Sequence, residues 1–322
     1  MANPPVLSIV LTGRNDDWHG GDFNERFLRT LAFNHDRLTE REIPHEIVLV
    51  EWNPVPDRPP LAELAATAFP ELAGGVLVSY IVDRRFHDAV TLNPNLQYLQ
   101  FVAKNVGIRR ATGDFILSTN ADVLLGRHVI DVFAGRQLEP RTVYRAARVD
   151  IQLGADPGHW DWAFLEDARN YARRPVLKPP LYAGGTGDFV LLDRISMHDV
   201  RGFNEVYRLA SVGVDYNFLV KAHANGLRLV DIGGPVYHPN HVGSFRLSKG
   251  IDSPERSHFG DYRWHSRNVI YHNPDAWGLA NAPVHPAGHG AFQLEFDWSA
   301  VPPLLDLRGV VLPGERVGQV RP

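Results

Sequence analysis

The sequence predicts an α/β protein with a doubly wound, mostly parallel sheet and helices on both faces. Apolar runs of strand length alternate with helical periodicity in the order β-α-β-α-β-α-β through the first part of the chain. Each run is nearly continuously apolar, as expected for a strand buried on both faces. Polar clusters follow three of the runs, at Thr12–Asp16, Glu51–Asn53 and Asn120–Asp122. They should meet at the carboxyl edge of the sheet, where open α/β sheets bind ligands.

The elements of this first part follow from periodicity and from turn residues. Strands are expected at residues 6–11, 47–50, 76–82 and 115–117, and helices at 23–38, 61–69 and 96–111. Asp22 stands three residues before Glu25, which resembles a capping box at the start of the first helix. Gly113 follows the third helix as a stop signal.

The pattern is less regular in the rest of the chain. Strands are expected at residues 142–151, 189–192 and 227–232, with a helix at 215–224 that Gly226 ends and an irregular segment at 152–182. From residue 243 onward there is little periodicity, and Arg, His and Pro dominate. We therefore expect one domain over residues 1–242, with halves of about 1–125 and 126–242. Residues 243–322 would form a lid and a wrapping extension.

Composition and charge narrow the classes of function. The chain has 322 residues, of which 44% are hydrophobic, and a formal net charge of -4 that gives no reason to expect nucleic acid as a partner. It has no cysteine, which excludes disulfides and thiolate chemistry. The first residues do not have the pattern of a signal peptide, and no apolar run approaches the roughly 18 residues that span a membrane. We expect a cytoplasmic protein without an integral membrane segment.

Asp122 and His238 are the candidate metal ligands. A divalent cation that bridges a diphosphate needs few protein ligands, since phosphates and waters fill the other positions. Asp122 ends a predicted strand, and His238 follows another, in Tyr-His-Pro-Asn-His. Their imidazole and carboxylate would suit Mn²⁺ or Mg²⁺, although Mg²⁺ favours oxygen. Alternatively, Asp122 caps the next segment, His238 bonds to backbone, or His238 and His241 form a zinc pair.

Asp215 is the candidate general base. It lies at a predicted helix start, where it could deprotonate an acceptor hydroxyl or serve only as a cap. Asp188 follows Gly184, Gly185 and Gly187, which would let the backbone approach a ligand or simply make a turn.

Trp160 and Trp162 lie in the irregular segment, where aromatic rings suit stacking on the C–H face of a sugar. Anchoring of the loop by the two indoles is an equal alternative. Arg246, Lys249 and Arg256 lie in the expected lid and could clamp phosphates, or form a solvated basic surface.

The order of these motifs resembles that of family 2 glycosyltransferases of the GT-A fold, over about residues 6–242. Leu7–Asn15 is similar to the family's first strand and nucleotide loop, and Glu46–Asn53 to its second strand, which ends in an acidic residue. Ala103–Leu117 resembles the helix and strand that lead into the family's DxD motif. That motif stands here as Asn120-Ala121-Asp122, with asparagine for the first aspartate. The glutamate that precedes the family's catalytic aspartate is also missing, because Val214 precedes Asp215.

The resemblance implies an inverting, metal-dependent transfer of a sugar from a nucleotide-diphosphate sugar to a hydroxyl of a glycan or small molecule. A UDP-sugar is favoured, with a GDP-sugar as the alternative. Asp215 would be the base, and Asp122 and His238 would hold Mn²⁺ or Mg²⁺. The nucleotide-sugar residues would be Thr12, Arg14, Asn15, Glu51, Lys104, Asn105 and Asn120. The acceptor side would be Trp160, Trp162 and Asp188.

Two other functions remain open. A sugar-1-phosphate nucleotidyltransferase shares the α/β order and the metal, but such enzymes usually carry a glycine-rich loop with Arg and Lys after the first strand. Thr12–Asp16 has one glycine and no lysine. A non-catalytic protein that binds nucleotide sugars or glycans would also fit, given Asn120 and the missing glutamate.

Overall fold

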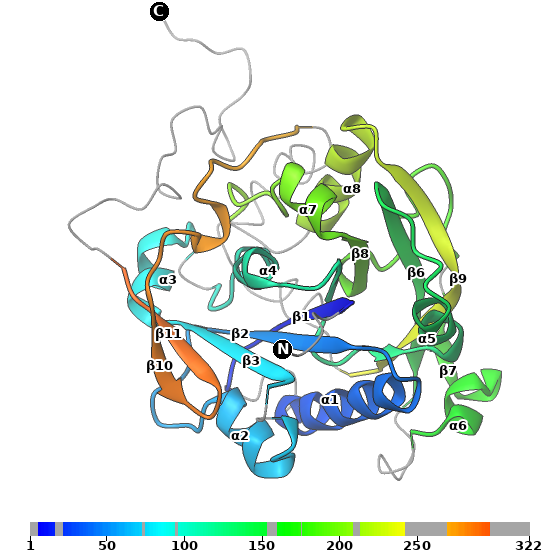
Figure 1. Ribbon diagram of the computed structural model, residues 1–322, viewed down its shortest axis with the longest axis horizontal. Coiled ribbons are helices and arrows are strands. Elements are labelled where there is room, and N and C mark those ends of the chain that lie inside the picture. Colours follow the sequence, from blue (N-terminus) through cyan, green and yellow to red (C-terminus); the bar gives the residue numbers. More distant parts are fainter. Residues whose placement is uncertain are drawn as a thin grey trace, which may run out of the picture.

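The computed structural model describes residues 6–16, 22–72, 75–93, 96–152, 160–174, 176–208, 213–241 and 269–296. One mixed sheet runs through these residues in the order β10-β11-β3-β2-β1-β4-β8-β6-β9-β5, and β7 pairs with β6 (Figure 1). Helices cover both faces of this sheet, which confirms the predicted α/β class.

Four parallel strands form the first half of the sheet. They are β1 (Leu7–Gly13), β2 (His45–Trp52), β3 (Leu77–Val82) and β4 (Phe115–Thr119). Leu7, Ile9 and Leu11 of β1 belong to one hydrophobic cluster, and Val10 belongs to another on the opposite face. Alternate residues of a strand point to opposite faces, so β1 must be apolar at almost every position.

The second half of the sheet is mixed. Its strands are β5 (Leu124–Leu125), β6 (Thr142–Ile151), β7 (Tyr171–Arg173), β8 (Phe189–Asp193) and β9 (Arg228–Pro239). β8 pairs antiparallel with both β4 and β6, whereas β6 and β9 are parallel. β9 is longer than the predicted strand 227–232 and extends to the histidine of the candidate metal site.

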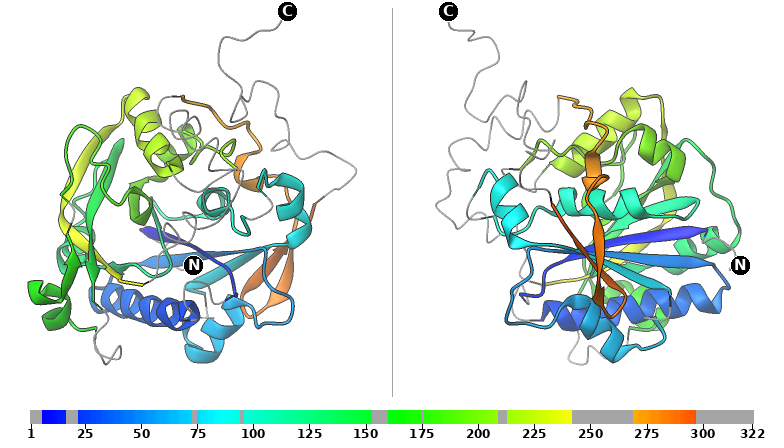
Figure 2. Two further views of the ribbon diagram at one scale, coloured as in Figure 1. Left: turned by 180° about the vertical axis from the view of Figure 1, so that it is seen from behind. Right: turned by 60° about the vertical axis from the view of Figure 1, so that its left-hand side comes forward.

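The helices form two layers. They are α1 (Phe23–Glu40), α2 (Leu61–Ala68), α3 (Arg84–Val90), α4 (Gln100–Arg110), α5 (Arg127–Ala134), α6 (Trp162–Glu166), α7 (Arg194–Asp199) and α8 (Val214–Ala224). Helices α1 and α2 lie on one face of the parallel strands, and α4 lies on the other, on the same side as α7 and α8 (Figures 1 and 2). No helix among the described residues is long and apolar enough to cross a membrane.

The predicted capping box at the start of α1 is wrong. Asp22 occupies the N-cap position, but its side chain accepts no capping hydrogen bond. It forms an ion pair with Arg26 one turn further along α1 instead. That interaction uses the carboxylate that a capping box would need for a backbone N–H.

The chain after residue 242 contributes two strands that periodicity did not reveal. β11 (Ala291–Leu294) pairs parallel with β3, and β10 (Val284–Gly288) pairs antiparallel with β11 (Figure 1). A short turn of helix at Trp277–Leu279 packs against α4. There Gly278 has φ 63°, and a Cβ atom would come within 2.5 Å of the Asn105 carbonyl oxygen. The predicted domain boundary after residue 242 stays a prediction, and Arg246, Lys249 and Arg256 lie outside the described residues.

Candidate functional site

Asp122, His238 and His241 form a cluster at the carboxyl edge of the sheet. Asp122 follows β4. His238 is the second-last residue of β9, and His241 comes just after that strand. One ligand atom from each residue lies within 4.8 Å of the others. Asp122 Oδ2 is 3.6 Å from His238 Nε2 and 3.2 Å from His241 Nε2. The structure thus brings together the two predicted ligands and adds His241, considered from the sequence only as a zinc partner of His238.

The Asp122 carboxylate is held in its charged form. Burial by itself would raise its pKa, but His238, His241 and Arg26 outweigh this effect and hold the pKa well below the usual range of an aspartate. Arg26 contributes from α1, with Nε 3.6 Å from Asp122 Oδ2. The charged carboxylate, flanked by two imidazoles, could therefore serve as a ligand of a cation.

The donor set fits a divalent metal ion. His238 Nε2 and His241 Nε2 lie 3.2 Å apart, so two ring nitrogens face one another beside a carboxylate oxygen. In the neutral form one of these nitrogens must carry a proton to bond the other, whereas a cation accepts lone pairs from both. Two imidazoles and one carboxylate suit Mn²⁺ better than Mg²⁺, because Mg²⁺ prefers an all-oxygen shell.

Asn120 is the centre of a second network. Its Oδ1 accepts hydrogen bonds from Gln100 Nε2 at 2.7 Å and from Lys104 Nζ at 2.9 Å. Its Nδ2 donates to Asp188 Oδ1 at 2.7 Å. A residue here must both accept and donate, and an amide does so where a carboxylate cannot. The amide of Asn120 therefore suits its neighbour Asp188. A second carboxylate at position 120 would be repelled by the carboxylate of Asp188.

We predict that Asn120→Asp destabilises the protein by about 1–3 kcal/mol, because it would face the carboxylate of Asp188 without a donor. Urea unfolding at neutral pH measures the loss. The double variant Asn120→Asp with Asp188→Asn restores one donor between the two positions, so it should recover part of that loss. Equal stability of the single variant and the wild type would show that Asp188 does not require the amide.

Asp215 and Asp188 lie near two buried cations. Lys104 Nζ donates to the Gly187 carbonyl oxygen at 2.7 Å, and a Cβ atom on Gly187 would lie 3.5 Å from Asp215 Oδ2. Burial lowers the pKa of Lys104 to about 8 and that of Arg145 to about 10, although Asp188 and Asp215 act in the opposite direction on both.

Asp215 is the second residue of α8, and its environment suits proton transfer. Its Oδ1 accepts a hydrogen bond from the Tyr216 backbone N–H at 2.9 Å. Burial raises the pKa of Asp215, and nearby Asp188 adds to the increase, while Arg145 and Lys104 oppose it. A raised pKa makes a carboxylate a stronger base at neutral pH.

Several predicted nucleotide-sugar residues hold loops in place. Asn15 Nδ2 donates to three carbonyl oxygens, those of Val55, Arg58 and Pro59. Asn105 bonds both the backbone of Phe203 and the carboxylate of Glu205. Their side chains are buried, so their contact with a nucleotide stays a prediction.

Thr12 and Arg14, two further residues of that predicted set, lie at the carboxyl end of β1. Thr12 accepts a hydrogen bond from the Tyr98 hydroxyl. Arg14 Nε donates to the Asn53 carbonyl oxygen at 2.6 Å, and its guanidinium pairs with Asp16. The structure places these groups beside the end of β2, where Glu51 lies. Their role in nucleotide binding also stays a prediction.

Glu51 is a buried carboxyl group with spare acceptor capacity. Its Oε2 accepts from the Leu61 N–H at the start of α2, at 3.0 Å, and Oε1 has no hydrogen-bond partner among the described residues. Burial raises its pKa to about 7. The folded protein therefore keeps a proton that the unfolded chain releases between about pH 4.5 and pH 7.

We predict that this proton makes wild-type stability fall as pH rises through that window. Glu51→Gln should remove the fall, so its free energy of unfolding relative to wild type should rise by up to about 3 kcal/mol from pH 4.5 to pH 8. Urea unfolding across this range measures the difference. The exposed Glu71 offers the control Glu71→Gln, which should keep the wild-type pH dependence. Parallel curves for Glu51→Gln and wild type would contradict the prediction.

Trp160 and Trp162 pack onto the protein rather than standing free. Both are partly buried against a cluster that contains Phe33 and Tyr237. The Trp162 ring meets the Phe33 ring edge-on at 5.3 Å, and the Arg127 guanidinium lies 5.0 Å from its centroid. This packing agrees with the loop-anchor alternative, and sugar stacking by the two indoles stays a prediction.

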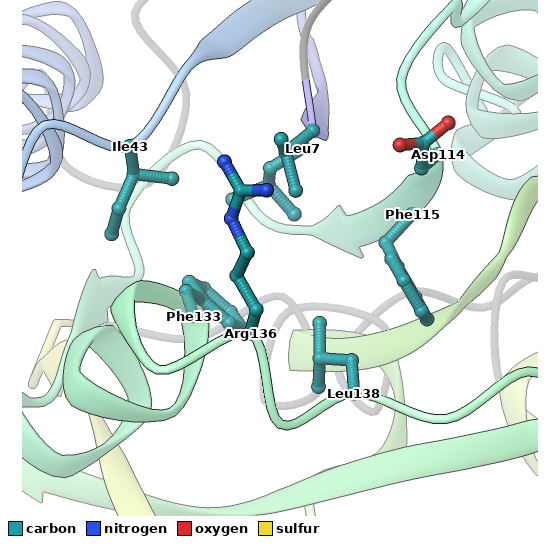
Figure 3. Close-up of a pocket in the computed structure, with 8 residues that line it drawn as sticks. Leu7, Ile43, Asp114, Phe115, Phe133, Arg136 and Leu138 are labelled. Atoms are coloured by element: carbon teal, nitrogen blue, oxygen red, sulfur yellow. The ribbon is translucent and has the colours of Figure 1, made fainter.

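A pocket at the opposite edge of the sheet is separate from this site. Leu7 and Phe115, at the amino ends of β1 and β4, line it together with Phe133 and Leu138 (Figure 3). Asp114 and Arg136 are its charged residues. The candidate metal cluster lies beyond the carboxyl end of β4, so this pocket contributes nothing to it.

The mixed, mostly parallel α/β fold is GT-A-like. No family model matches the sequence, and no curated protein matches it. The likeness is therefore one of structure, and membership in family 2 stays a prediction.

Three solved structures to which this chain is similar are as follows. The structure of GalNAc-T7 with UDP, GalNAc and Mn²⁺ superposes with a TM-score of 0.52 and 16% identity, over 87% of this chain and 54% of that one. The chain thus spans about half the length of that protein. The catalytic domain of Drosophila β1,4-galactosyltransferase 7 in complex with xylobiose has a TM-score of 0.47 and 13% identity, over 90% of this chain and 94% of that one. A nucleotidyl transferase from Methanothermobacter thermautotrophicus has a TM-score of 0.36 and 13% identity, over 76% of this chain and 96% of that one. The first of these establishes the shared fold.

Proposed function

We propose that this protein is a divalent-cation-dependent glycosyltransferase that moves a sugar from a nucleotide-diphosphate sugar to a hydroxyl acceptor. The cluster of Asp122, His238 and His241 at the carboxyl edge of the sheet carries the proposal. Its support is twofold: the donor atoms suit Mn²⁺, and the fold is shared with a glycosyltransferase whose structure contains UDP and Mn²⁺. A UDP-sugar is the donor that we propose, with a GDP-sugar as the alternative.

The residues have separate roles in this proposal. Asp122, His238 and His241 would hold the metal ion, which when bound offsets the negative charge that develops on a departing diphosphate. Thr12, Arg14 and Glu51 would hold the nucleoside, and the acceptor would lie on the side of Asp188 and Asp215.

Asp215 would act as the base in a single displacement. The acceptor oxygen forms a bond to the anomeric carbon, the bond from that carbon to the diphosphate oxygen breaks, and the hydroxyl proton passes to the Asp215 carboxylate. The electron pair of the broken bond leaves with the nucleoside diphosphate. The outcome is inversion at the anomeric carbon, as the resemblance to family 2 implies. The raised pKa of Asp215 favours its accepting this proton.

A thermal-shift screen tests the proposal. UDP-, GDP-, dTDP- and CMP-sugars are added with Mn²⁺, and the true donor should raise the melting temperature because it binds only the folded state. Release of nucleoside diphosphate from that donor, with sugar found on an added acceptor, would confirm transfer.

The alternatives give different products. A nucleotidyltransferase would convert nucleoside triphosphate and sugar 1-phosphate into nucleotide sugar and pyrophosphate, and a binding protein would show a thermal shift without turnover. Either result would contradict the proposed function.

A further inference from the structure

The two ring nitrogens of His238 face different partners. Nε2 points to the cluster, toward Asp122 and His241. Nδ1 lies 3.2 Å from Asp150 Oδ1. A neutral imidazole carries one proton, and a metal ligand needs the proton on the nitrogen that does not bind the metal. Asp150 thus lies beside Nδ1. An acceptor at Nδ1 favours the tautomer with its proton there, and this tautomer leaves the lone pair of Nε2 free for a metal ion.

Strand pairing fixes this placement. β6 and β9 are parallel, and their register sets Asp150 directly opposite His238. Opposed residues of neighbouring strands share a face, and a slip of one residue would turn Asp150 to the other face. The contact is therefore built into the long β6–β9 pairing and does not depend on a loop.

Arg148 holds Asp150 and connects it to the acceptor side. The Nε atom of Arg148 is 2.8 Å from Asp150 Oδ1, and its Nη1 donates to Asp188 Oδ2 at 3.0 Å. Asp188 in turn accepts from Asn120. Arg148 and His238 approach the same oxygen of Asp150, so the guanidinium sets the position of the oxygen that faces the imidazole.

We propose that Asp150 and Arg148 are positioning residues for the metal ligand His238. Asp150 accepts the Nδ1 proton and so presents the Nε2 lone pair to the cation. Arg148 holds Asp150 in place and ties it to Asp188. The inference rests on the proposed function, since it concerns the ion that Asp122, His238 and His241 would bind. Carboxylates behind metal-bound histidines orient the ring and raise ligand basicity.

A simple structural ion pair would not require this arrangement. Arg148 already has a partner in Asp188, and an Arg–Asp pair is best satisfied when both carboxylate oxygens face the guanidinium. Here Oδ1 of Asp150 is shared with an imidazole instead. Both Asp150 and His238 are buried, so the imidazole has few other acceptors for an Nδ1 proton.

The test compares Asp150→Ala, Asp150→Val and Arg148→Gln with wild type. Arg228→Gln is the matched control, because it breaks an exposed arginine pair, with Glu139, on the same strand as His238. The first measurement is the Mn²⁺ dissociation constant from the EPR signal of free Mn²⁺, without nucleotide. The second is the protonation of the His238 ring nitrogens, from ¹⁵N NMR of the metal-free protein at one fixed pH.

Asp150→Ala should weaken Mn²⁺ binding by roughly 10- to 100-fold. Arg148→Gln should weaken it less, and Arg228→Gln should leave it unchanged. In wild type the proton should reside on Nδ1 of His238, and this preference should be lost in Asp150→Ala. If the alanine variant does not fold, Asp150→Val, which has no acceptor atom and fills more of the space, decides the question.

Wild-type Mn²⁺ affinity in both Asp150 variants, with the proton still on Nδ1, would overturn the inference. Weaker binding with no change at Nδ1 would also overturn it, since Asp150 would then act only through its charge. If the wild type binds no Mn²⁺, the proposed function fails instead. The NMR result on the metal-free protein still decides whether Asp150 orients His238.

Discussion

Replacing Asp122 with alanine is expected to weaken Mn²⁺ binding by on the order of 100-fold or more, since loss of an outer-shell partner alone costs 10- to 100-fold. Asp122 supplies the only carboxylate oxygen in the cluster formed by the described residues, and its negative charge sits between two imidazoles. Without it the site would offer only two imidazole nitrogens beside Arg26, a cation that repels metal. Sugar transfer should fall to background with the loss of the metal.

The measurement is Mn²⁺ binding by EPR, followed by nucleotide affinity with and without Mn²⁺. Asp114→Ala is the matched control, because Asp114 directly precedes β4 and is exposed at the opposite edge of the sheet. It should bind Mn²⁺ as wild type does. If Asp122→Ala and wild type bind Mn²⁺ and nucleotide equally, Asp122 is not part of a metal site.

Replacing Asp215 with asparagine is expected to lower kcat by roughly 10²- to 10⁴-fold, the usual contribution of a general base. The amide keeps the shape of the side chain and can still accept the Tyr216 N–H, so α8 should begin as before. Affinity for the donor nucleotide and Mn²⁺ should stay within experimental error, because Asp215 is not a member of the cluster of Asp122, His238 and His241. The loss would then appear in kcat and hardly in KM for the donor.

The pH profile adds a second check. Burial raises the pKa of Asp215, so the wild-type rate should rise with pH through a value above the ordinary range of an aspartate. Asp199→Asn, an exposed change in the last residue of α7, should leave both kcat and this profile unchanged. Full turnover in Asp215→Asn would remove Asp215 as the base and would leave the metal site unaffected.

Many strands and helices of the fold could be predicted, because each shows its apolar pattern within a few consecutive residues. A strand buried on both faces needs apolar residues at nearly every position, and β1 and β4 show this in a few consecutive residues. Helix α4 could be found from its spacing because its apolar positions contact β1 and β2. Strands β10 and β11 could not be found from periodicity. The edge strand β10 is exposed along its whole length and so has no alternation of apolar residues, and β11 has only 4 residues.

The residues of the candidate site also fall into those that a local sequence pattern reveals and those that it does not. Asp122 was found because a polar tip directly follows an apolar run. His241 was considered only as a zinc partner of His238, because no local pattern shows that it folds back toward Asp122. Asp150 and Arg148 were missed because they lie within β6 and resemble the polar positions of a half-exposed strand.

The sequence by itself determined the α/β class, the parallel strands β1 to β4, and the gathering of polar residues at their carboxyl ends. These depend on periodicity over a few residues, where each side chain's preference is set by its neighbours in the chain. Only the tertiary structure decided which of those residues meet. The pairing of β6 with β9 sets Asp150 beside His238, and the pairing of β4 with β8 brings Asn120 to Asp188. Strand register is fixed by packing of the whole sheet, and no local pattern encodes it.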